Sequence, residues 1–146
     1  MPHLPTEKEI NPYDDLDGRS VARHLLGKSV DEATELLCEN SIHYYEDYTW
    51  MGPAAFCYYA PALVAYLDCP EAEGDVDVTY FLISCFRSRI ENDGIHVFEA
   101  ISTMQDFCSA VESRFSYLGF DDEYRLRFLR RVNELDAAIK VAQPQK

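Results

Sequence analysis

The sequence predicts an all-α fold, a single-domain irregular bundle of about six helices. With 146 residues, the chain has the length of one domain. Apolar residues make up 47% of it, which is enough for a hydrophobic core. No stretch alternates apolar and polar residues for long enough to indicate a strand, whereas several stretches repeat apolar residues at helical spacing. The connections between these stretches are short, which favours antiparallel neighbours.

The chain divides into three parts. Residues 1–16 contain three prolines and no periodicity, so we expect an extended N-terminal arm. Residues 17–142 form the helical domain, and residues 143–146 form a frayed tail.

Two capped helices open the domain. Asp17 is expected to cap the first, and Gly27 ends it at a position that requires a left-handed residue. Ser29 opens the second helix, and Glu32 three residues later completes a capping box. The apolar residues that share one face of each helix are Val21, Ala22, Leu25 and Leu26, then Val30, Ala33, Leu36 and Leu37.

Residues 53–67 contain no charged side chain. A helix that is apolar on all sides is buried, so this one is predicted to be the central element. Pro53 is favourable as its first residue, and Pro61 is expected to kink or break it. The residues before it, 40–52, show no periodicity and are expected to be irregular.

Three more helices follow. Asp75 or Asp77 caps one that runs to about residue 91, and its expected inward residues are Val78, Phe81, Leu82, Cys85, Phe86 and Ile90. Residues 96–118 carry an unbroken helical stripe, and Gly119 ends it. That stripe consists of Val97, Ile101, Met104, Cys108, Val111, Phe115 and Leu118.

The last helix covers residues 122–142 and is capped by Asp121. Its expected inward residues are Leu129, Val132, Leu135 and Ile139. The only basic concentration of the chain lies here and just before, at Arg114, Arg125, Arg127, Arg130 and Arg131. We expect these arginines to pair with the acidic half across the bundle or to coat a solvated face.

The charge of the chain is strongly negative. There are 26 acidic and 13 basic residues, which gives −13 and a pI near 4.5. Residues 1–50 carry 11 acids and 4 bases, residues 51–100 carry 8 and 2, and residues 101–146 carry 7 and 7. Such a chain repels nucleic acid and anionic membranes and attracts a protein partner with a basic surface. The alternative is that the acidity serves solubility alone.

The five cysteines are Cys38, Cys57, Cys69, Cys85 and Cys108. Their number is odd and none has C-x-x-C spacing, so we expect free, mostly buried thiols in a reducing compartment. The N-terminus has no apolar run typical of a signal peptide, and no stretch approaches 18 apolar residues. These observations favour a cytoplasmic location.

The loop at residues 43–51 is the candidate binding site. It gathers aromatic and acidic side chains, a typical mixture for a recognition surface that selects a cationic partner. The candidate residues are Tyr44, Glu46, Asp47, Tyr48 and Trp50. The alternative is that Tyr48, Trp50 and Met51 cover the buried helix, with Glu46 or Asp47 as a cap or an arginine partner.

No motif indicates catalysis, a cofactor or a metal. No histidine has HExxH spacing, and no nucleotide-binding glycine pattern occurs. Asp15-x-Asp17 and Asp75-x-Asp77 do not continue as EF-hand loops. We therefore expect no cofactor, no metal and no catalytic residue.

One stretch resembles a family. The run EDYTWMGPAAFCYYAPALVAYL at residues 46–67 and the segment before it resemble a group of small uncharacterised bacterial proteins. Their shared core pattern is E-D-x-x-W-M-G-P-x-A-F-x-[FY]-Y-x-P-A, and the similarity covers roughly residues 11–70. The group has no established activity to carry over. By analogy of class, the size and acidity are similar to those of bacterial immunity proteins, which block a toxin by binding it.

Three functions from different classes follow. The first is a non-catalytic acidic protein-binding module of immunity or inhibitor type, which binds a basic partner and requires a continuous negative field bordered by the Trp50 loop. The second is a structural or oligomeric helical domain with a large apolar contact patch. The third is an enzyme with a non-standard carboxylate site at Glu46 and Asp47, together with His43, which requires a cleft.

Overall fold

The computed structural model describes residues 3–143, and all regular structure in this range is helical. The predicted all-α fold is therefore confirmed. Six helices of ten or more residues occur in the range: α2 (Leu16–Leu25), α3 (Val30–Glu39), α6 (Pro53–Tyr66), α7 (Val76–Asp93), α8 (Ile101–Glu112) and α10 (Asp122–Ala142). The shorter elements are α1 (Glu7–Ile10), α4 (Ser41–Tyr44), α5 (Asp47–Trp50), α9 (Phe115–Leu118) and the 3₁₀ turns η1 (Pro70–Ala72) and η2 (Gly94–Ala100). Apart from Gln143, the predicted tail lies outside the described residues.

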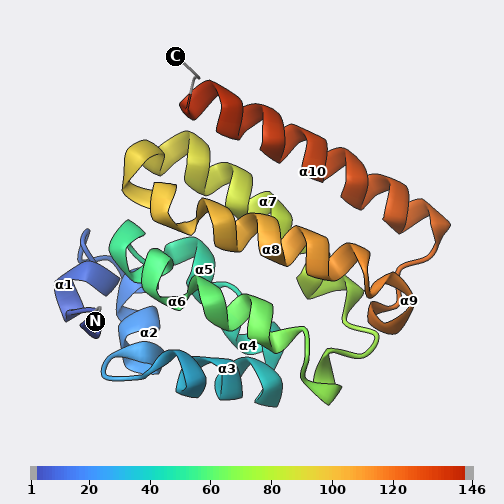
Figure 1. Cartoon of the computed structure of the whole chain (residues 1–146). Coiled ribbons are helices and arrows are strands. Elements are labelled where there is room, and N and C mark those ends of the chain that lie inside the picture. The colour runs from blue at the N-terminus through green and yellow to red at the C-terminus, as the bar shows by residue number, and fades with distance from the viewer. Residues whose placement is uncertain (1–2, 144–146) are drawn as a thin grey trace.

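Helix α6 is the central element, as its lack of charge predicts. It packs between α3 on one side and α8 with η2 on the other, and α10 lies along α7 at the outside of the bundle (Figure 1). Its fully buried side chains include Phe56, Tyr59 and Tyr66. The Tyr59 hydroxyl lies 2.8 Å from the backbone carbonyls of both Leu25 and Lys28, so α6 also holds the connection between α2 and α3.

Of the two effects predicted for Pro61, a kink or a break, the break is wrong, because α6 continues through Pro61. A proline inside a helix removes one backbone hydrogen bond and costs about 3 kcal/mol. Pro61 itself faces solvent, so its ring needs no room in the core. Buried side chains on both sides of it, such as Phe56 and Leu63, stabilise the helix and offset that cost.

The N-terminal arm is not fully extended. Thr6 and Glu9 form a capping box around α1, and Ile10 at its end is completely buried. Asp15, rather than Asp17, caps α2 by accepting a hydrogen bond of 2.7 Å from the Gly18 amide. A helix of four residues is too short to show periodicity in the sequence, which is why the arm was expected to lack one.

Residues 40–52 are also more regular than expected. Asn40 caps α4, and its side chain accepts a hydrogen bond of 3.2 Å from the His43 amide. Tyr45 and Glu46 connect α4 to α5 with right-handed helical backbone angles. Segment 41–50 is therefore an almost continuous helical ribbon. Its polar and aromatic composition shows no apolar periodicity, so the sequence did not predict a helix there.

The expectation that all five cysteines are free is wrong, because Cys38 and Cys69 form a disulfide. The bridge joins the end of α3 to the loop before η1, and η1 packs back against α3. Only this tertiary contact brings the pair together, so the spacing could not reveal it. The expectation of a reducing compartment rested on free thiols and loses that support. Separately, no helix of the described chain combines the length and apolarity that crossing a bilayer requires.

For the helices after residue 75, most of the predicted inward residues are buried, but some details of the prediction are wrong. The stripe from Val97 to Leu118 is buried, apart from the partly buried Phe115, although the backbone is divided into η2, α8 and α9. Two residues expected to point inward do not: Phe81 is 58% exposed and Leu129 is 38% exposed. Asp121 caps α10 as predicted.

Candidate functional site

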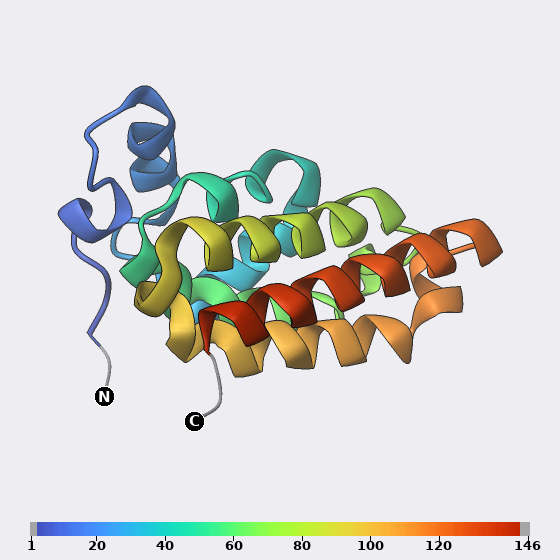
Figure 2. The same ribbon diagram turned by 90° about the horizontal axis from the view of Figure 1, so that it is seen from above.

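Segment 41–50 and helix α7 run side by side in the same direction. The rings of Tyr45 and Phe81 lie 5.8 Å apart, and four residues further along α7 the Cys85 thiol donates to the Tyr48 carbonyl at 3.3 Å. The contacts thus advance together along both segments, which makes them parallel. Figure 2 shows α4 and α5 along one flank of α7 and α10 along the other.

Exposed and buried residues alternate along segment 41–50 with helical spacing. The exposed positions are Ile42, His43, Glu46, Thr49 and Trp50, and Tyr45 is half-buried. Asp47 and Tyr48 point into the molecule. One side of the segment therefore packs on the core, while the other continues the surface of α7.

The exposed apolar side chains of this face form what we name the aromatic strip, whose members are Tyr13, Ile42, Tyr45, Trp50 and Phe81. Tyr13 is 79% exposed, Ile42 74%, Phe81 58% and Trp50 50%. Tyr45 is half-buried against Phe81, and Tyr13 lines one cavity together with Trp50. Large apolar side chains gathered at the surface are typical of a binding site rather than of core packing.

Carboxylates border the aromatic strip. Glu46 follows Tyr45, Asp77 lies one turn before Phe81 on α7, and Asp15 lines the cavity with Trp50. In residues 3–143, none of these three carboxylates has a lysine or arginine nitrogen within 4.0 Å. Their charges therefore remain available to a partner.

Arg89 is the one basic residue lining the cavity at the strip, and its charge is directed inward. Its guanidinium donates to the backbone carbonyls of Tyr48 and Met51 and pairs with Asp93 at 3.0 Å. It also lies 4.7 Å above the centre of the Phe56 ring. Because the side chain is only 7% exposed, it does little to cancel the negative surface outside.

The structure brings the five predicted site residues together but distributes them over two sides of one segment. Glu46 and Trp50 lie at the surface, as a binding role requires. Asp47 and Tyr48 are buried, and Tyr44 is half-buried. The alternative of a core cover thus describes Tyr48, whereas Asp47 neither caps the helix nor pairs with an arginine.

Asp47 pairs with a histidine rather than with solvent. Its Oδ2 atom lies 2.9 Å from Nδ1 of His24, and the rings of His43 and Tyr44 pack 5.0 Å from the His24 ring. Burial raises the pKa of Asp47, although the hydrogen bond with His24 opposes that shift. The pair fastens α5 to α2.

This arrangement gives a carboxylate enzyme site little support. Glu46 and Asp47 point to opposite sides of the segment, so they do not act as a pair. None of five surface cavities in the described part of the chain is lined by His24, His43 or Asp47.

In the core pattern E-D-x-x-W-M-G-P, most of the residues W-M-G-P serve packing. Gly52 donates its amide to the Ile10 carbonyl at 3.0 Å, and a Cβ at Gly52 would overlap the backbone oxygen of Glu9 and lie 2.9 Å from Pro12. Pro53 starts α6. Only Trp50 of the four presents its side chain to the surface, so the pattern joins a packing requirement to a recognition residue.

Sequence reasoning missed Tyr13, Ile42, Tyr45 and Phe81 as surface residues. The spacing placed Phe81 on the inner face of α7, four residues before Cys85. However, apolar residues cover most of the circumference of this helix, and its neighbours α10, η2, α8 and α5 leave Phe81 exposed. This excess of apolar residues could have indicated an exposed site from the sequence, because a helix that is apolar on more sides than its neighbours cover exposes one of those sides.

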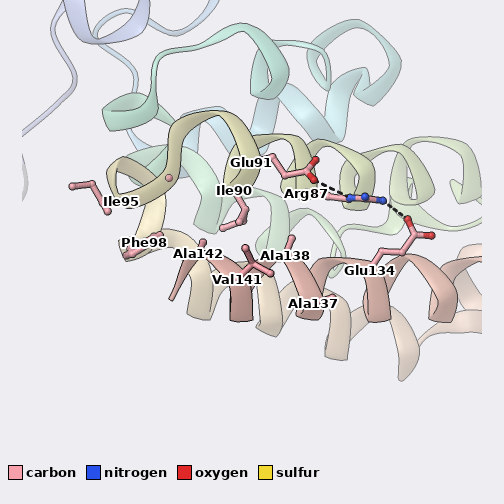
Figure 3. A pocket seen from close by; sticks show the side chains of 11 residues that line it. Arg87, Ile90, Glu91, Ile95, Phe98, Glu134, Ala137, Ala138, Val141 and Ala142 are labelled. Atoms are coloured by element: carbon pink, nitrogen blue, oxygen red, sulfur yellow. Dashed lines mark hydrogen bonds and ion pairs between the residues drawn. The ribbon is translucent and has the colours of Figure 1, made fainter. Parts of the chain in front are cut away.

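The largest of these five cavities lies elsewhere, between α7, η2 and the last turns of α10. This groove of about 650 Å³ is lined by Ile90, Ile95, Phe98 and Val141 and by small alanines of α10 (Figure 3). At its polar end Arg87 bridges Glu91 and Glu134, and Arg131 also lies 3.4 Å from Glu134, so these four charged groups neutralise one another. It is an apolar surface with no free charge to select a partner.

The late arginines leave most of the acidic half unpaired. Among the described residues, Arg114 is the only late arginine paired with one of its carboxylates, at 2.7 Å from Asp68, whereas Arg127 and Arg131 pair with acids of their own helix. Of the 19 carboxylates in residues 1–100, four contact a lysine or arginine within the described chain. The outer face of α3, which leads into α4, carries the exposed acids Asp31, Glu32, Glu35 and Glu39.

One group among the described residues has metal-ligand chemistry at close range: Cys38, Cys69 and Glu71, with donor atoms within 4.8 Å of one another. Both sulfurs belong to the disulfide, however, and a disulfide sulfur is not a thiolate ligand. The group therefore gives no ligand set while the bridge is intact.

Comparison with known proteins yields no match for this chain, whether among family models, curated proteins or solved structures. The resemblance to the small bacterial group thus remains a prediction, and the function is argued from the surface alone.

Proposed function

We propose that this protein is a non-catalytic protein-binding module that binds a basic protein partner through the aromatic strip. The observation that supports the proposal best is the coincidence of exposed aromatic side chains with unpaired carboxylates on one face. By the analogy of class drawn from size and acidity, the module is of immunity or inhibitor type. In this role it neutralises its partner by occupying a surface.

Each component of the surface has a physical role in such binding. Trp50, Tyr45 and Phe81 supply rigid apolar area, and aromatic residues of this kind dominate the energy of protein interfaces. Glu46, Asp77 and Asp15 select a cationic counterpart at short range. The net charge of −13 attracts a basic partner and repels nucleic acid and anionic membranes at long range.

The test is affinity capture with matched variants. The wild-type chain, the Tyr45→Ala/Phe81→Ala variant and a Leu126→Ala control are used as bait at low salt. Leu126 is 66% exposed on α10, away from the strip. A specific partner should be retained by the wild type and by the control and lost by the strip variant. Mass spectrometry then identifies it, and its association rate should fall as salt rises.

Two outcomes would contradict the proposal. Identical capture by all three baits would show that the strip is not the interface. A partner whose association rate is insensitive to salt would exclude the electrostatic contribution.

A structural or oligomeric helical domain is the second candidate, and the apolar groove of Figure 3 favours it. Ile95 and Val141 at that groove are 72% and 82% exposed. It ranks second because two copies of charge −13 repel each other and the groove has no free charge to offset this. A concentration-independent monomer in light scattering would remove it, and a dimer abolished by Val141→Glu would favour it.

A further inference from the structure

A cavity of about 310 Å³ lies at the end of the aromatic strip, between the N-terminal arm, α5 and α7. Tyr13 and Trp50 provide its aromatic walls, and Asp15, Ser88 and Asn92 provide polar groups. Its volume is at the small end of the range for ligand sites and is close to the size of a long side chain rather than of a large metabolite.

The fold builds this cavity through a close approach of two backbones. Gly52 lets the arm at Glu9 and Pro12 pack directly on the start of α6, which brings Tyr13 beside Trp50. Asp14 turns the chain with a φ of 50°, a conformation that is uncommon outside glycine. Residues far apart in the sequence thus form one wall.

The electrostatics of the cavity favour a cation. Arg89 and Asp93 line it but pair with each other, which leaves the Asp15 carboxylate in excess. Asp15 is held in place because its Oδ1 atom accepts the Gly18 amide hydrogen bond, and no hydrogen bond to its Oδ2 occurs within residues 3–143. Trp50 and Tyr13 add aromatic rings to the lining, and the face of an aromatic ring attracts a positive charge.

We propose that this cavity binds one cationic side chain of the partner, an arginine in preference to a lysine. A guanidinium is planar, so it can stack on the indole of Trp50 while it donates to the carboxylate of Asp15, and an ammonium ion cannot do both equally well. The inference rests on the proposed function, because it names the partner group that the strip would anchor. It extends that function from a basic surface to a single recognised residue.

Trp50 is the only tryptophan of the chain, so its indole N–H gives one resonance that reports on the cavity directly. The full-length protein is titrated with N-acetyl-arginine amide, with the lysine analogue and with the citrulline analogue. Citrulline matches arginine in shape but carries no charge. We expect a saturable shift with arginine, weaker binding of lysine and at least a 5-fold weaker response to citrulline.

Two variants locate the site. Asp15→Asn retains a good N-cap for α2 and should fold normally, yet it should weaken the arginine probe about 3- to 5-fold, as expected for loss of one partly exposed charge pair. Tyr13→Ala should weaken it by a similar factor. Glu112→Gln, at an exposed acid of α8 outside both the strip and the cavity lining, is the matched control and should leave the affinity unchanged.

An equal response to arginine and citrulline, or an unchanged affinity in both cavity variants, would overturn the inference. These readouts need no macromolecular partner, so they separate it from the proposed function. Loss of partner capture in the Tyr45→Ala/Phe81→Ala variant with no arginine response at Trp50 would retain the strip and remove the cavity. An arginine response at Trp50, with partner capture unaffected by the Tyr45→Ala/Phe81→Ala variant, would retain the cavity and remove the strip.

Discussion

Gly52 is the position at which one added methyl group tests the packing of the N-terminal arm. Its φ of −66° is accessible to alanine, so Gly52→Ala introduces no backbone strain. The new Cβ would instead overlap the backbone oxygen of Glu9 and approach Pro12 to 2.9 Å. Backbone atoms cannot rotate away, so the arm must move off the start of α6.

The size of the effect follows from what the arm contributes. Moving it exposes Ile10, which is completely buried, and breaks the hydrogen bond from Gly52 to its carbonyl. Burial of such a side chain contributes about 1.5–3 kcal/mol and the hydrogen bond about 1 kcal/mol. We therefore expect Gly52→Ala to lower the free energy of unfolding by about 3 kcal/mol.

Urea unfolding followed by Trp50 fluorescence measures this change, and Gly27→Ala is the matched control. Gly27 has a φ of 80° and no atom within 4 Å of its added Cβ, so alanine there costs only backbone strain, about 1 kcal/mol. A Gly52→Ala variant no less stable than Gly27→Ala would refute the argument from close packing.

Three further outcomes are expected. Tyr48→Phe should raise the free energy of unfolding by about 1 kcal/mol, because the buried Tyr48 hydroxyl has no hydrogen-bond partner among the described residues. Tyr59→Phe should lower it by a similar amount, because the Tyr59 hydroxyl donates to backbone carbonyls. Urea titration measures both changes. Denatured, unreduced protein should show three reactive thiols, because two of the five cysteines form the disulfide. Cys38→Ser should lower the free energy of unfolding by about 3–4 kcal/mol, because it removes a crosslink between residues 31 positions apart. Burial raises the pKa of Asp47 above its ordinary value, so the stability that this carboxyl contributes is complete below its unfolded pKa and is lost as pH rises through the folded pKa. Asp47→Asn does not titrate and should therefore gain stability relative to the wild type as pH rises, which thermal unfolding at a series of pH values measures.

Each expectation has a contrary result. Tyrosine variants that change stability in the same direction would refute the hydrogen-bond argument. Five reactive thiols would exclude the disulfide. A stability difference between the wild type and Asp47→Asn that is constant with pH would show that burial does not perturb the carboxyl.

Helix positions were predictable where long apolar stripes and caps coincide. Ser29 with Glu32, and Asp121, cap as expected, because a cap depends on atoms only a few residues apart. Pro61 was misjudged because its local cost was visible while the packing that outweighs it was not. Four-residue helices such as α1 leave no period to detect.

The candidate site was predictable in location but not in orientation. The sequence identified Glu46 and Trp50 correctly as surface groups, since aromatic and acidic residues cluster there. It could not show that the ribbon turns Asp47 and Tyr48 inward, because that depends on the α7 surface against which the segment packs. Phe81 and Tyr13 join the site only through tertiary contacts.

The buried guanidinium of Arg89 has a further consequence. Its bonds to two carbonyls of the α5 region and to Asp93 prevent sliding between that ribbon and its neighbouring helix. The exposed face is consequently set before any encounter, and little conformational freedom remains to be lost on docking. Complexes formed on so stiff a template should differ in lifetime more than in speed of formation.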